Sequence, residues 1–345
     1  MNKLYCVIYL PMIALMLAIG PYSLAQDKTT LVYSLPKTEF VIEVQTEKIT
    51  QKPGVFYKYS ERYLASSDVL TKEKTTYKLK GISVKTRTSP DLKRTFNFVV
   101  SKGNYTIKLN VNQQGILTGI NAPVASHEAG NTQSVNFSNA ENKMGSLLPL
   151  SEEFMLAGSE AKLAEGAAKQ IYRIRERRLN IITGDVDHLP TDGSSLTSMV
   201  QGMDKMEAEL TELFTGKTTS EVFTHNIVVS PQAPANNQIL FRLSSITGIV
   251  PNDDLSGAPY YISFVAGAIP NINTDPKVKT DKEGLFYIIP MPTQVNISDG
   301  VKTLFTAQYL IPQFGKTIPI SDRLYEKPQA KVIIDEQTGR LLGVE

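Results

Sequence analysis

The sequence predicts an α+β protein that is mainly β, with two β-rich units on either side of a central antiparallel helical hairpin. Strand-like alternation of apolar and polar residues occupies both ends of the chain. Long helical periodicity is found only between Glu160 and Lys217. Because short strands follow one another closely, each β-rich unit is expected to be a sandwich or a partly open barrel.

Residues 1–25 have the features of a secretory signal peptide. Lys3 precedes an apolar run from Tyr5 to Ile19, and Ser23-Leu24-Ala25 supplies a small-x-small cleavage site before Gln26. Export to a bacterial envelope is therefore expected, with no membrane span left after cleavage. A retained N-terminal anchor is the alternative.

Cysteine usage narrows the possible chemistry. Cys6 is the only cysteine and lies within the predicted signal peptide, so the mature chain contains none. Disulfides, thiolate nucleophiles and cysteine metal sites are thereby excluded from the mature protein. The sequence also carries no recognisable nucleic-acid-binding motif, and nucleic acid is not expected as a partner.

The N-terminal β-rich unit is expected over residues 26–150. Apolar and polar residues alternate from Phe40 to Thr46, which is typical of a half-buried strand. The spacing of aromatic residues in 55–64 predicts one short helix. Alternation resumes from Thr76 to Arg87 and breaks at Gly81, which indicates a β-bulge.

The helical hairpin is expected over residues 151–217. Gly184 is placed to end the first helix, and Gly216 to end the second. Ser194 or Ser195 is the expected N-cap of the second helix. About ten residues link the two helices, and so short a link favours antiparallel packing.

The C-terminal β-rich unit is expected over residues 218–345. Its strand-like segments are repeatedly interrupted by proline, which has no backbone N–H to donate to a ladder. Many of these segments are therefore expected to be edge strands or to begin in loops.

The link between the two helices carries the candidate catalytic and metal-binding residues. Asp185, Asp187 and His188 could supply acid and base groups for a hydrolase that uses carboxylates. Asp185, Asp187 and Asp192 could bind a hard cation such as calcium, although their spacing is not that of an EF-hand.

A dense group of arginines offers a structural explanation for these carboxylates. The guanidinium fork suits carboxylates, and an antiparallel hairpin brings the end of the first helix beside the link. Pairing of the arginines with the link carboxylates is therefore the favoured interpretation. Alternatively, they bind an external carboxylate, phosphate or sulfate. The arginines are Arg173, Arg175, Arg177 and Arg178.

The leading functional hypothesis is a non-catalytic binding or structural protein of the cell envelope. No Gly-x-Ser-x-Gly or His-Glu-x-x-His motif is present, and no cofactor is expected. One alternative is a hydrolase of envelope or dietary polymers. Another is a binder of anions or acidic glycans, since residues 26–125 contain 16 basic and 8 acidic residues. A glycan or another envelope protein is the partner that these hypotheses imply.

Several ordered segments resemble those of one known family. AAKQIYRIRERRLNIITGDVDHLP and ELTELFTGK in the centre, YSLPKTEFVIEVQTEK and KPGVFYKYSERYL near the start, and GLFYIIPMP and AQYLIPQFGKTIPI near the end carry the resemblance. The chain resembles the domain of unknown function 4831 family, whose members are exported proteins of Gram-negative gut bacteria. The resemblance implies a shared architecture and a periplasmic or envelope location. It assigns no activity, and no residue inherits a role from it.

Overall fold

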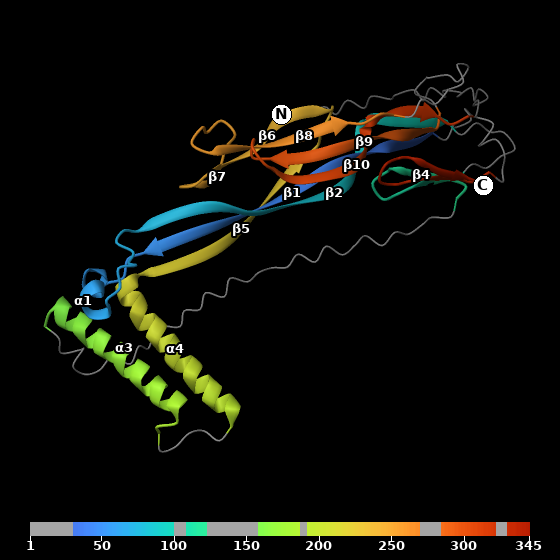
Figure 1. Ribbon diagram of the computed structural model, residues 1–345. Coiled ribbons are helices and arrows are strands. Elements are labelled where there is room, and N and C mark those ends of the chain that lie inside the picture. The colour runs from blue at the N-terminus through green and yellow to red at the C-terminus, as the bar shows by residue number, and fades with distance from the viewer. Residues whose placement is uncertain (1–29, 100–107, 123–157, 187–191, 270–283, 322–329) are drawn as a thin grey trace, which may run out of the picture.

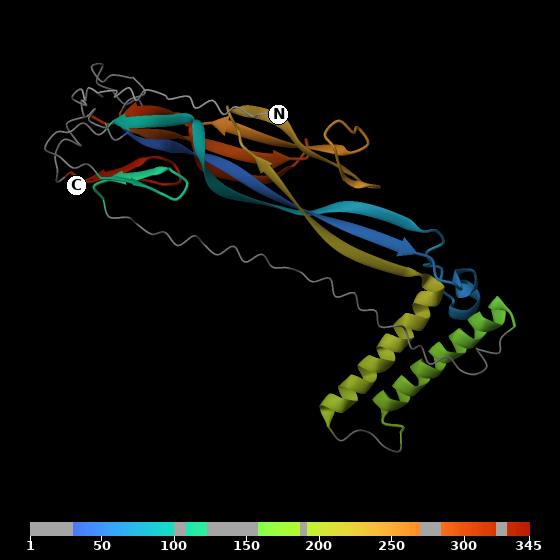
Figure 2. The same cartoon turned by 180° about the vertical axis from the view of Figure 1, so that it is seen from behind.

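The computed structural model describes residues 30–99, 108–122, 158–186, 192–269, 284–321 and 330–345. The molecule is elongated: stacked sheets form a body at one end, and two helices form a head at the other (Figures 1 and 2). A ribbon of three strands joins the two. The predicted fold class is confirmed, since antiparallel sheets dominate and a helical hairpin lies at the centre of the sequence.

The longest sheet has the strand order β2-β1-β5 and extends from the body to the head. Its central strand pairs antiparallel with both neighbours, so segments from before and after the helical hairpin share one sheet. The register shifts where Gln45 faces Gly81 but Thr46 faces Leu79, which confirms the bulge predicted at Gly81. The strands are β1 (Thr30–Lys52), β2 (Lys74–Val99) and β5 (Lys217–Val229).

A five-stranded sheet of order β10-β9-β8-β6-β7 packs on this sheet and completes a sandwich. Phe40, Ile42 and Val44 alternate along β1, so all three enter the core between the sheets, as period-2 geometry requires. The strands are β6 (Ala235–Ser244), β7 (Gly248–Val250), β8 (Ala258–Ala266), β9 (Phe286–Ser298) and β10 (Thr303–Pro319).

A third sheet, of order β12-β11-β4-β3, covers a second core at the far end of the body. Tyr33 and Leu35 of β1 enter this core, and Phe286 and Ile288 of β9 join them. Both long strands therefore serve two cores. The strands are β3 (Leu109–Val111), β4 (Leu117–Ile120), β11 (Val332–Ile334) and β12 (Leu341–Val344).

The head contains α3 (Glu160–Thr183) and α4 (Gly193–Thr215), which pack together as predicted. Gly184 ends α3 with a positive φ of 76°, and Gly216 ends α4, both as expected. The predicted N-cap of α4 is wrong. Asp192 takes that position, because its carboxylate accepts from the N–H of Ser195 at 2.6 Å.

The short helix predicted over residues 55–64 is confirmed as η1 (Tyr57–Tyr59) followed by α1 (Ser60–Leu64). It packs against the hairpin where the head meets the ribbon, and Phe56 contacts Phe214 there with ring centroids 5.5 Å apart. No helix in the described ranges combines the length and apolar character needed to cross a membrane.

Candidate binding pocket

Prolines interrupt the pairing of β9 with β10 at one point in the body. Ile311 of β10 faces Met291 of β9, whereas Lys316 faces Ile289, so residues 312–315 bulge out of the ladder. Pro290 lies between the two β9 residues and cannot donate a backbone hydrogen bond. The ladder therefore opens at this position.

Two polar side chains join the bulge to its surroundings: Gln313 from within the bulge, and Arg94 from β2 of the opposite sheet. The amide of Gln313 accepts from the N–H of Thr38 at 2.9 Å and donates to its C=O at 2.8 Å, as a neighbouring strand would. It also donates to the C=O of Pro231 at 3.2 Å. Arg94 donates to the carbonyls of Pro312 and Gln313, each at 2.9 Å. The bulge is thus a fixed part of the body.

The turn between β11 and β12 closes the site from a third direction. Gly339 occupies this turn with a φ of 67°, and its C=O accepts from the N–H of Ile288 at 2.7 Å. Asp335 accepts from the N–H groups of Gln337 and Thr338, which fixes the turn. This anchoring places Arg340 beside β9.

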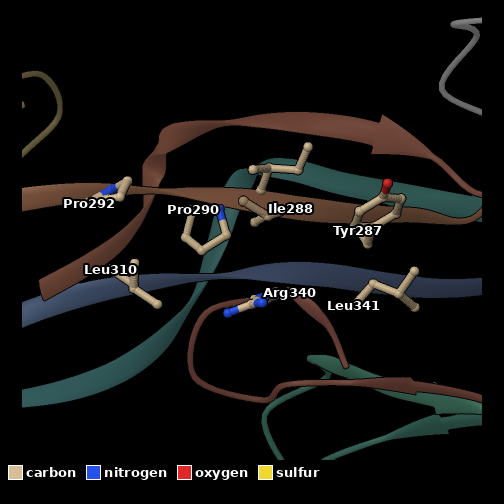
Figure 3. Close-up of a pocket in the computed structure, with 8 residues that line it drawn as sticks. Tyr287, Ile288, Pro290, Pro292, Leu310, Arg340 and Leu341 are labelled. Carbon is tan, nitrogen blue, oxygen red and sulfur yellow. The ribbon is translucent and has the colours of Figure 1, made fainter. Parts of the chain in front are cut away.

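An open pocket of about 400 Å³ lies between β9, Leu310 of β10 and the segment of Arg340 and Leu341. Figure 3 shows Arg340 from the β11–β12 turn and Leu341 at the start of β12 on one side, with the β9 residues Tyr287, Ile288 and Pro290 on the other. The volume falls within the range usual for small-molecule sites. The lining residues are Tyr287, Ile288, Ile289, Pro290, Pro292, Leu310, Arg340 and Leu341.

The lining combines an apolar wall with two polar side chains, Arg340 and Tyr287. Partial burial raises the pKa of Tyr287, so its hydroxyl stays a proton donor at neutral pH. Arg340 is exposed, and no ion pair occupies its guanidinium in the described part of the chain. None of the eight lining residues is a carboxylate or a histidine. The arrangement is suited to binding an apolar molecule that carries one negatively charged group, which Arg340 would contact.

Sequence reasoning did not identify this pocket. The signal available was Pro290-x-Pro292 within one strand-like segment and Pro312 within the next. Such prolines predict an interrupted ladder. They do not show which distant segments close around the gap.

Of the sequence-predicted catalytic and metal candidates, Asp185 and Asp192 are described, and both lie at the far tip of the head. Asp185 is exposed just after α3, while Asp187 and His188 are outside the described residues. Asp192 caps α4, and hydrogen bonds from Ser195 and Ser194 lower its pKa to about 2. Within the described ranges, no group of three or more His, Cys, Asp or Glu is arranged to hold a metal ion. The hydrolase hypothesis stays a prediction.

Two of the four arginines have partners that the sequence analysis did not predict. Arg175 and Arg178 pair with carboxylates of α4, whereas residues 187–191 of the link lie outside the described residues. Arg175 Nε lies 2.6 Å from Glu207, and Arg178 contacts both Asp204 and Glu207. These pairs form a charged layer above the apolar core of the head.

Arg173 and Arg177 lie exposed on α3. Arg175 and Arg178 already have carboxylate partners on α4, and anion binding by the arginines stays a prediction.

Comparison with known proteins identifies a family. A family model described as a domain of unknown function (DUF4831) matches residues 29–342, nearly the whole chain. Neither a curated protein nor a solved structure gives a match.

Proposed function

This chain belongs to the domain of unknown function 4831 family, and from that premise we propose that it is a non-catalytic binding protein of the cell envelope. The pocket between β9, β10 and the β11–β12 turn supports binding. Its ligand carries one negatively charged group on an apolar body. The single observation that carries this proposal is Arg340, exposed beside an otherwise mainly apolar wall.

The charge on the ligand follows from the chemistry of arginine. A guanidinium beside apolar side chains favours a carboxylate or phosphate, because its planar fork forms charge-assisted hydrogen bonds with either group. Binding of a hydrocarbon against the aliphatic and proline side chains of the wall is favourable, because it removes apolar surface from water.

Decanoate and decanol are suitable probes, because they share a hydrocarbon chain and differ in the charged group. By isothermal titration calorimetry, we expect decanoate to bind at least tenfold more tightly than decanol. Arg340→Gln is expected to weaken decanoate binding about 10- to 100-fold, since a hydrogen bond to a charged group contributes about 1.5–3 kcal/mol.

Arg173→Gln is the matched control, because it makes the same chemical change on an exposed residue of the head. It is expected to leave decanoate affinity unchanged. Equal affinities for decanoate and decanol, or an unchanged affinity in Arg340→Gln, would contradict the proposal.

The envelope location rests on the N-terminal sequence. We expect protein recovered from the envelope fraction to begin at Gln26, because Ser23-Leu24-Ala25 has the small residues that signal peptidase requires. Mass spectrometry of the N-terminal peptide measures this. In Ala25→Leu, the bulky side chain is expected to leave residues 1–25 attached. A wild-type protein that begins at Met1 would instead support a retained anchor.

A further inference from the structure

Strand β5 (Lys217–Val229) is the open edge of the ribbon. It is the outermost strand in the order β2-β1-β5, and β1 is its one strand neighbour among the described residues. Figures 1 and 2 show it along one side of the ribbon from the head to the body. Along such an edge, alternate backbone N–H and C=O groups point outward and can pair with another strand.

This edge lacks proline and β-bulges, two of the features by which proteins block pairing. All thirteen residues of β5 pair with β1 in one continuous register, without a bulge, and none is proline. The opposite edge strand, β2, differs: it contains Pro90, and its register with β1 shifts twice. Prolines and bulges prevent edge-to-edge association, so β2 is protected and β5 is not.

Apolar side chains lie exposed along the same strand. The exposed fractions are 47% for Val222, 41% for Phe223 and 50% for Val228. Among the described residues, no second sheet packs on most of β5, and the first ten residues of β5 are all exposed. A strand added at this edge would cover part of these side chains and pair the outward backbone groups.

We propose that this strand pairs antiparallel with β5 of a second copy of the chain, about a two-fold axis at Phe223. Phe223 is the middle residue of the thirteen, so only this centre pairs the whole strand with itself. It sets Phe223 against Phe223. It also sets Glu221 of each copy opposite His225 of the other, a carboxylate acceptor against an imidazole donor, twice by symmetry.

Other self-pairing centres are poorer. An axis at Glu221 opposes two carboxylates directly, which is unfavourable, and pairs fewer residues. An axis at His225 also leaves part of the strand without a partner. The preferred register joins the two ribbons into one six-stranded sheet, in which the two heads point in opposite directions.

Cysteine cross-linking tests the register directly, because Cys6 is the only cysteine in the chain. In a Cys6→Ser background, Phe223→Cys is expected to form a disulfide-linked dimer under mild oxidation. Directly opposed residues in antiparallel strands have Cα atoms about 4.5–5.5 Å apart, within the range of disulfides. Non-reducing electrophoresis with band densitometry measures the cross-linked fraction.

Thr219→Cys in the same background is the matched control. In the proposed register Thr219 faces Ile227, so the two Thr219 positions lie about eight residues apart, roughly 26 Å along the strand. No cross-link is expected. Equal cross-linking of both variants, or none in Phe223→Cys, overturns the proposal.

Solution association gives a second measurement. Sedimentation equilibrium of the wild type is expected to show a dimer at micromolar concentration. Phe223→Lys, which opposes two cations at the axis, is expected to raise the dimer dissociation constant at least tenfold. Val301→Lys, at a residue 98% exposed in the β9–β10 turn, is expected to leave it unchanged. A wild type that stays monomeric at 100 µM overturns the proposal. The proposal is also overturned if β5 pairs with a strand of a different protein and not with a second copy of this chain.

Discussion

Replacing Phe40 with alanine is expected to lower the free energy of unfolding by about 3–5 kcal/mol, as for other fully buried phenylalanines. Phe40 is 0% exposed at the centre of the sandwich core. Its ring lies 5.4 Å from that of Phe264 and 5.2 Å from that of Tyr309, measured between centroids. The truncated side chain would leave a cavity that backbone strands on both sides cannot easily fill. Urea denaturation followed by far-UV circular dichroism measures the loss.

Val32→Ala is the control for this substitution, because Val32 lies on the same strand and is 60% exposed. We expect a change within about 0.5 kcal/mol, as is usual at exposed sites. Equal losses for Phe40→Ala and Val32→Ala would show that the two sheets do not form a common core.

Gln313→Leu is expected to lower the free energy of unfolding of the body by about 2–4 kcal/mol, although the two side chains have similar volumes. Leucine cannot replace the three hydrogen bonds of the amide, so the N–H and C=O of Thr38 and the C=O of Pro231 lose their partner. Unpaired groups away from water cost about 1–3 kcal/mol each, reduced here by partial access to solvent. The midpoint of urea denaturation measures the effect.

The exposed Gln337 in the β11–β12 turn provides the same chemical change at a surface position. Gln337→Leu is expected to shift the midpoint only slightly. If Gln313→Leu is as stable as the wild type, the amide does not join β10 to β1.

Local patterns predicted much of the fold because each depends on neighbouring residues. The alternation around Phe40 directed its side chain into a core, and Gly184 ended a helix where a positive φ is needed. The bulge at Gly81 was likewise visible as a break in alternation. The N-cap of α4 was missed because Asp192, Ser194 and Ser195 are all good caps.

Long-range partners could not be predicted from these patterns. Arg178 had carboxylates available both in the link and on the facing helix, and only the packing angle of the helices decides between them. The pocket presents the same problem, since β9, β10 and the turn holding Arg340 are brought together by sheet topology. The spacing of residues within any one segment does not predict that these three segments lie together.

The ribbon between head and body has a mechanical consequence. A force that pulls the head away from the body acts along β1, β2 and β5, whereas their hydrogen bonds run across the strands. The load is therefore shear, and many bonds must fail together before the strands slide. Bending meets much less resistance, because in the described part of the chain no second sheet covers the ribbon near the head. The connection between head and body is therefore expected to be strong in tension and compliant in bending.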